Sequence, residues 1–312
     1  MRSSPRPQSL PAARIAASRS RLAMLTTLAM FAFAGNSLLC RIALKATAID
    51  PATFTTIRIA AAATVLWFIQ RARVQQPRGG GDWYAALALF VYAAAFSFAY
   101  VGLAAGAGAL LLFGAVQATM IGYALWSGER LQIRQWLGVA LALAGLVVLV
   151  LPGLVPRNAA SPSLAPPLAS SLLMLAAGIA WGVYSLHGKR AADPAAATAG
   201  NFLRAVPFAI ALSVLTLLGA PIHTPLSVDR AGVVYALISG AITSGLGYVI
   251  WYAALKELKA SSAATVQLSV PLIAALGGVA LLNEALTARL VVSAVAILGG
   301  IALVIVRPSK AV

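Results

Sequence analysis

Long apolar runs limit what this chain can fold into more than any other feature of its sequence. A helix that crosses the hydrocarbon core of a bilayer needs about 20 largely apolar residues. Only helices and closed barrels satisfy all their backbone hydrogen bonds inside lipid, and runs of this length are typical of helices. We therefore predict an all-α integral membrane protein with ten transmembrane helices. Their expected bounds are 22–44, 53–70, 83–103, 106–127, 135–152, 169–188, 198–218, 231–254, 260–282 and 288–306.

The boundary between the third and fourth runs follows from length alone. Residues 83–127 carry no charge, yet they are too long for a single crossing of the membrane. We expect the split between the two helices to fall at the stretch "AAGAGA", residues 104–109.

The composition agrees with a chain that is surrounded by lipid. Hydrophobic residues make up 61% of the sequence and charged residues 10%, whereas about a quarter of the residues of a soluble domain are charged. The net charge of +16 raises the question of nucleic-acid binding. Positive loops that orient membrane helices explain the charge better, so we expect no nucleic-acid partner. The single cysteine, Cys40, excludes an internal disulfide.

The positions of lysine and arginine predict the orientation of the chain. With a cytoplasmic N-terminus, 16 of the 23 basic residues fall in cytoplasmic segments and five in external ones. This bias favours cytoplasmic termini. Residues 1–21 are then a disordered cytoplasmic tail, and residues 307–312 form a second one. The run 22–39 is long for the apolar core of a signal peptide, so we expect it to remain as the first span.

A similar stretch stands near the end of each half of the chain. "ALWSGERL" precedes an apolar run in the first half and "ALLNEAL" does so in the second, so that Glu129 matches Glu284. We expect both glutamates at a tight turn between the fourth and fifth helices of a unit. There a carboxylate can accept hydrogen bonds from amides at the start of the next helix.

Earlier in each half, "FTTIRIA" parallels "GNFLRAV", so that Arg58 matches Arg204. A Pro- and Ser-rich external linker, residues 153–167, separates a first repeat, 22–152, from a second, 168–306. Five spans is an odd number, so the second repeat must be inverted in the membrane. Two inverted five-helix repeats are typical of secondary transporters, whose binding site lies near the midplane between the repeats.

The "SGERL" turn, the stretch "ASSAATVQLSVPLIAALGGVALLNEAL" and Arg58 in the second span carry a family resemblance. Over residues 22–306 the chain resembles the EamA-type branch of the drug/metabolite transporter superfamily. The resemblance implies ten helices, cytoplasmic termini and export of metabolites or drugs. The aromatic residues make the chain most similar to exporters of aromatic and other neutral amino acids in the bacterial inner membrane. The two halves differ where Pro271 stands opposite Val116, which argues against a strictly symmetric site.

Polar and aromatic residues near the midpoints of the spans are the candidate binding residues. Buried tyrosine and tryptophan offer a flat apolar body with a polar tip, which suits a neutral zwitterion with a large side chain. Helix packing is the simpler reading of any one of these residues. The substrate-binding candidates are Asn36, Tyr92, Phe96, Gln117, Trp181, Tyr184, Ser244, Tyr248 and Gln267.

Pro271 predicts a kink in the ninth helix. A proline removes one helical hydrogen bond and pushes away the carbonyl of the residue four positions earlier, which is Gln267. A freed carbonyl within a membrane needs a partner or a water-lined cavity. Gln267 is therefore a candidate for substrate contact, although neighbours such as Ser269 and Thr265 could also satisfy the kink.

The two arginines within spans allow two interpretations. Arg58 and Arg204 could capture an anionic group such as a carboxylate, or could reach the membrane interface or bond helix-end carbonyls. Their matching positions favour the structural role.

The seven acidic residues all lie at span ends or in links. Ion-coupled carriers usually hold an ionisable side chain within the membrane. We therefore expect transport driven by the gradient of the substrate itself, or coupling through a group that the sequence does not reveal. No Gly-rich phosphate loop is present, so we expect no ATP. His187 and His223 form no cluster, so we expect no cofactor, metal site or catalytic residue.

These features predict a carrier that exports aromatic and other neutral amino acids by alternating access around a central cavity. The alternatives are an efflux carrier for drugs or lipophilic cations and, third, a membrane-embedded enzyme. The small-residue pairs Gly138 with Ala142 and Ala296 with Gly300 allow close helix packing, within the chain or in a dimer. We favour packing within a monomer, whose partners are the small-molecule substrate and the lipid bilayer.

Overall fold

The computed structural model describes residues 12–72, 80–151, 167–188, 191–219, 227–258 and 260–305. Three predicted segments lie wholly or largely outside these residues: the start of the N-terminal tail, nearly all of the central linker, and the C-terminal tail.

The predicted ten transmembrane helices are confirmed, and the described residues contain no strand. The eighth span consists of α8, the π-helical segment η2 and α9, and the ninth consists of α10 and α11. The helices are α1 (Ala12–Ala46), α2 (Pro51–Arg71), α3 (Trp83–Gly102), α4 (Ala105–Trp126), α5 (Ile133–Val150), α6 (Leu168–Gly188), α7 (Pro194–Leu217), α8 (Arg230–Ile238), η2 (Ser239–Leu246), α9 (Gly247–Leu255), α10 (Ala260–Gln267), α11 (Ser269–Leu282) and α12 (Ala288–Ile305).

The first helix is longer than the sequence predicts. α1 begins at Ala12, so the second half of the expected N-terminal tail is helical. Residues 12–21 consist mainly of alanine, arginine and serine. Alanine and arginine are strong helix formers, and the helix nucleated by the adjoining span can extend through them.

Four of the seven acidic residues start helices. The side chains of Asp50, Asp82, Asp193 and Asp229 accept hydrogen bonds from amides in the first turns of α2, α3, α7 and α8. The first amides of a helix have no partner within the helix, and an aspartate before the first turn supplies one.

The split between the third and fourth spans is confirmed. The link consists of Leu103 and Ala104, and Ala105 already belongs to α4, so α4 begins one residue before the expected position and most of the "AAGAGA" stretch is helical. Ala104 offers no capping side chain. The amide of Ala105 instead donates to Oε2 of Glu284 at 2.7 Å, so a residue from the far end of the chain caps α4.

The expected role of Glu284 at the start of the following helix is therefore wrong. Its Oε1 accepts a hydrogen bond from Nε of Arg41 at 3.0 Å, and Thr287 caps α12 with its hydroxyl. Asn283 ends α11 with a φ of 51°, a left-handed conformation that asparagine tolerates. The chain consequently turns back and places Glu284 beside α1 and α4.

Glu129 does not cap the helix that follows it either. It is exposed, and the side chain of Gln135 accepts from the amide of Gln132 at the start of α5. Like Glu284, it follows a residue of positive φ, since Gly128 has a φ of 89°. The two turns thus share a local geometry, while the inverted relation of the two halves stays a prediction.

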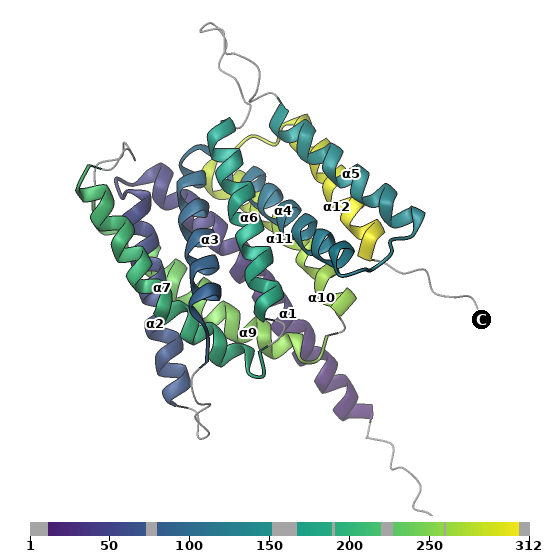
Figure 1. Cartoon of the computed structure of the whole chain (residues 1–312), viewed down its shortest axis with the longest axis horizontal. Coiled ribbons are helices and arrows are strands. Elements are labelled where there is room, and N and C mark those ends of the chain that lie inside the picture. The colour runs from purple at the N-terminus through teal and green to yellow at the C-terminus, as the bar shows by residue number, and fades with distance from the viewer. Residues whose placement is uncertain are drawn as a thin grey trace, which may run out of the picture.

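α5 and α12 lie side by side at one edge of the molecule (Figure 1). A Cβ atom added to Gly138 or to Gly300 would clash with the backbone of the opposite helix. Ala142 also faces Gly300, and Ala296 faces Gly145. These contacts confirm that the small residues serve packing within the chain.

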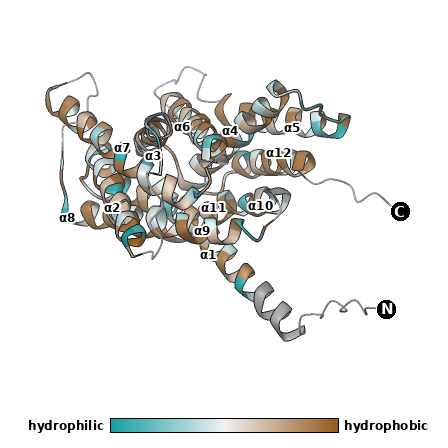
Figure 2. Cartoon of the chain, turned by 60° about the horizontal axis from the view of Figure 1, so that its bottom comes forward, coloured by the Kyte–Doolittle hydropathy of each residue, from teal (hydrophilic) through white to brown (hydrophobic). Residues whose placement is uncertain are grey.

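The outer surface of the bundle is apolar. Hydrophobic residues run along most of the helices (Figure 2), and Leu137, Val295 and Phe68 are 61%, 70% and 61% exposed. A surface of this kind is stable against lipid and not against water. Together with the ten spans, it identifies a multi-pass membrane protein.

Candidate functional site

A small cavity lies at the centre of the bundle, between elements of both halves of the chain. Its volume is about 30 Å³, which is room for about one water molecule. The structure brings seven of the nine predicted binding residues into its wall. They are Asn36, Tyr92, Phe96, Trp181, Ser244, Tyr248 and Gln267.

Aromatic rings form one side of this cavity. The ring centroid of Trp181 lies 4.7 Å from that of Tyr92 and 5.3 Å from that of Tyr248. The ring of Phe96 lies 5.4 Å from Tyr92. α3, α6 and α9 each contribute rings, so the aromatic wall joins helices from both halves. Such a wall can stack against a flat apolar group.

Hydrogen-bonding side chains also line the cavity. Nδ2 of Asn36 donates to the hydroxyl of Tyr92 at 3.3 Å. Oδ1 of Asn36 accepts from Ser239 at 2.8 Å and from Thr243 at 3.4 Å, and both of these residues belong to η2. A π-helical turn is often found at a functional site. The cavity thus combines flat rings with polar groups that can orient a ligand.

Two predicted residues do not line the cavity. The hydroxyl of Tyr184 donates to Thr198, which in turn donates to Tyr252, each at 3.2 Å, so Tyr184 joins α6 to α7 and α9. Its ring still lies 5.4 Å from that of Trp181. Gln117 is buried on α4 without reaching the wall. Both side chains fit the packing interpretation that the sequence left open.

Five further residues of the wall are not among the binding residues predicted from the sequence. One partial signal was available, because Phe33, Asn36 and Ser37 are spaced to share one face of a helix. Leu112 and Phe113 of α4 carry no sequence signal that separates them from other core residues. The five are Phe33, Ser37, Leu112, Phe113 and Thr243.

The ninth span is interrupted at the residues predicted to be affected by Pro271. α10 ends at Gln267 and α11 starts at Ser269. The hydroxyl of Ser269 donates to the carbonyl of Val266 at 2.7 Å, which satisfies one backbone group at the break. Gln267 itself lines the central cavity.

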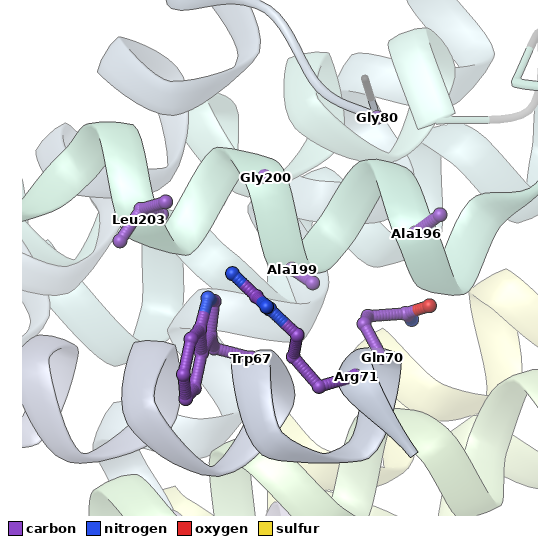
Figure 3. A pocket seen from close by; sticks show the side chains of 8 residues that line it. All are labelled: Trp67, Gln70, Arg71, Gly80, Ala196, Ala199, Gly200 and Leu203. Atoms are coloured by element: carbon purple, nitrogen blue, oxygen red, sulfur yellow. The ribbon is translucent and has the colours of Figure 1, made fainter. Parts of the chain in front are cut away.

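A larger cleft of about 190 Å³ lies elsewhere, between the end of α2 and the first half of α7. Trp67 and Arg71 extend from α2 toward α7 (Figure 3), with the guanidinium 4.8 Å from the indole centroid. The cleft contains none of the predicted binding residues. Trp67 and Leu203 are 41% and 55% exposed on the lipid-facing surface, so lipid chains can fill it. We therefore favour the central cavity as the functional site.

In the described ranges, no three His, Cys, Asp or Glu side chains lie close enough together to hold a metal ion. The cavity wall offers rings, hydroxyls and amides, which suit the binding of an intact small molecule.

Comparison with protein families gives one match along nearly the whole chain. The model of the EamA-like transporter family matches residues 21–151 and 168–306. The two matched segments are separated by the central link between the halves.

Curated relatives include both uncharacterised proteins and transporters. An uncharacterised protein of Pseudomonas aeruginosa is 54% identical over 269 residues, which cover 85% of this chain and 88% of that protein. An uncharacterised transporter of Archaeoglobus fulgidus is 26% identical over 276 residues, which cover 85% of this chain and 90% of that protein. A "probable amino-acid metabolite efflux pump" of Escherichia coli is 26% identical over 59% of this chain and 62% of the pump.

The fold also resembles a solved structure. A crystal structure matches with a TM-score of 0.59 and 19% sequence identity, covering 92% of this chain and 97% of the other. At this level of identity the match concerns the fold alone.

Proposed function

The chain belongs to the EamA-like transporter family, and from this premise we propose that it exports aromatic and other neutral amino acids. The wall of the central cavity is the observation that carries the proposal. Trp181, Tyr92 and Tyr248 surround it with rings, while Asn36 and Ser244 add polar groups. Relatives named as amino-acid metabolite efflux pumps support the same substrate class.

The size of the cavity supports alternating access. Ligand sites for drug-sized molecules occupy about 300–1,000 Å³, whereas this cavity has about 30 Å³. An aromatic amino acid therefore requires the helices around the cavity to move apart. Rocking of one repeat against the other opens such a site to one face of the membrane at a time.

We place the carrier in the bacterial inner membrane, and the charge distribution supports an orientation with both termini in the cytoplasm. In this orientation α1 ends at the external face, and the ion pair between Arg41 and Glu284 lies there. We infer that the carrier works as a monomer, without ATP or another cofactor.

We expect flux of labelled phenylalanine into proteoliposomes that contain the purified protein. Excess unlabelled tyrosine or leucine should suppress this flux, because a neutral amino acid shares the zwitterion and the apolar side chain. A quaternary ammonium ion should not suppress it. Empty liposomes serve as the control, and suppression by the ammonium ion alone would favour an efflux carrier for lipophilic cations instead.

We expect the initial rate of phenylalanine flux to be the same with and without a pH gradient. Asp50, Asp82, Asp193 and Asp229 are used as helix caps, and Glu284 is paired with Arg41. None of these carboxylates lies midway through a span, where a proton carrier usually holds one. The measurement compares rates at fixed substrate concentration across several internal pH values. A rate that rises steeply with the pH gradient would contradict gradient-driven transport.

A further inference from the structure

Arg58 is a charged residue in the core of the bundle that has few partners. It lies on α2 and is 2% exposed. Its Nη2 donates to the hydroxyl of Tyr92 at 3.2 Å, while its buried Nε and Nη1 have no hydrogen-bond partner among the described residues. A guanidinium carries five N–H donors, and an unpaired buried charge costs several kcal/mol, roughly, in free energy.

The surroundings of Arg58 supply rings and no counter-charge. The guanidinium carbon lies 4.9 Å from the ring centroid of Phe96 and 5.4 Å from that of Tyr92. Cation–π contacts of this kind recover part of the desolvation cost. Within the described part of the chain, ion pairs join Arg41 to Glu284 and His187 to Asp82, and none involves Arg58. Arg58 therefore lacks an anionic partner there.

Arg204, at the matching position of the second half, shows what a purely structural arginine looks like in this fold. Its Nη1 donates to the carbonyl of Gly80 at 2.9 Å and to that of Gly200 at 3.1 Å. The bond to Gly80 ties the segment before α3 to α7, which confirms the structural role for Arg204. Arg58 makes no bond of this kind among the described residues, so the two arginines differ in their use.

The same two rings connect Arg58 to the central cavity, because Tyr92 and Phe96 also line it. The hydroxyl of Tyr92 accepts from both Arg58 and Asn36, which leaves its own O–H as a further donor. The polar groups around this point are therefore arranged as donors: guanidinium, amide and phenol. A carboxylate can accept hydrogen bonds from several donors at once, and arginine binds a carboxylate in a bidentate manner.

We propose that Arg58 binds the carboxylate of the transported amino acid, with Tyr92 and Asn36 as neighbouring donors and Trp181 and Tyr248 facing its side chain. This inference rests on the proposed function, whose substrates all carry a carboxylate. The cavity expands on binding, and the carboxylate of the substrate then becomes the anionic partner of the guanidinium.

The experiment measures competition against labelled phenylalanine flux in proteoliposomes of the full chain. The two competitors are phenylalanine and phenylalaninamide, which have nearly the same shape and differ in the negative charge. In the wild type we expect phenylalanine to compete about 10- to 100-fold better, as expected for the loss of a hydrogen-bonded charge. Arg58→Gln should reduce this ratio to near one. Arg204→Gln, the matched control, should leave the ratio as in the wild type.

A folding defect is separated from a binding defect by two further measurements. Phenylalanine should raise the melting temperature of the wild-type protein in detergent and leave that of Arg58→Gln unchanged. If Arg58→Gln does not fold, Arg58→Lys keeps the charge but loses the planar fork, and it should lower the ratio without abolishing it. A wild-type ratio retained in Arg58→Gln, or in Arg58→Lys where Arg58→Gln does not fold, would overturn the inference alone. A wild-type protein that carries no amino acid would overturn the proposed function as well.

Discussion

Glu284→Ala should lower the free energy of unfolding by about 3 kcal/mol, the lower end of the cost of removing one partner from a buried ion pair, because this pair is partly buried. The side chains of Arg41 and Glu284 are 12% and 9% exposed. The change would leave the guanidinium of Arg41 without its counter-charge and the amide of Ala105 without its cap. Arg41 also donates to the carbonyls of Tyr100 and Val101, so it cannot easily turn toward water.

The measurement is unfolding in detergent, followed by tryptophan fluorescence over a denaturant series. Glu129→Ala is the matched control, because Glu129 occupies the corresponding turn and is exposed. It should change the free energy of unfolding by less than about 0.5 kcal/mol. Equal effects of the two changes would show that the contact between Glu284, Arg41 and Ala105 does not stabilise the fold.

Gly300→Ala and Gly299→Ala should change stability in opposite directions, although they are neighbours in α12. A Cβ atom at Gly300 would meet the backbone of Gly138 and Ala142, and backbone atoms cannot yield as a flexible side chain can. We expect a loss of about 1–3 kcal/mol, as for an overpacked core. A Cβ atom at Gly299 meets nothing within 4 Å, so the better helix former should add about 0.4–1 kcal/mol.

The same unfolding measurement tests both variants, and Gly138→Ala should behave like Gly300→Ala because the contact is reciprocal. The comparison removes the effect of helix propensity, since both glycines lie in the interior of one helix. If Gly300→Ala is as stable as Gly299→Ala, the close approach of α5 and α12 is not required for the fold.

Much of the fold could be predicted because lipid imposes strict rules on the backbone. A run of about 20 apolar residues has few alternatives to a spanning helix, so all ten spans were found. Some helix ends were predicted less well, since α1 begins at Ala12 and not at residue 22. The junction of α3 and α4 at Leu103 and Ala104 was expected from length alone, and nothing in the local stretch of alanine and glycine shows what caps α4. The cap comes from Glu284, 179 residues away.

The candidate site could be predicted in part for a similar reason. Polar side chains near span midpoints are costly in lipid unless they face the interior, and buried aromatic rings suit a large apolar ligand. This combined rule selected seven residues of the cavity wall. The same rule cannot separate a wall residue from a packing residue. Tyr184 bonds to Thr198 instead of lining the cavity, and Leu112 lines it although it resembles any core leucine.

The sequence by itself determined that this protein lies in a lipid bilayer, how many spans it has and to which family it belongs. These properties depend on composition and on local runs of residues. The tertiary structure alone decided how equivalent residues are used. Arg58 and Arg204 match in sequence, yet Arg204 donates to backbone carbonyls, whereas two buried nitrogens of Arg58 have no hydrogen-bond partner among the described residues. Glu129 and Glu284 match as well, yet only Glu284 meets an arginine and a helix start. These differences arise from contacts between distant segments, which no local pattern of residues records.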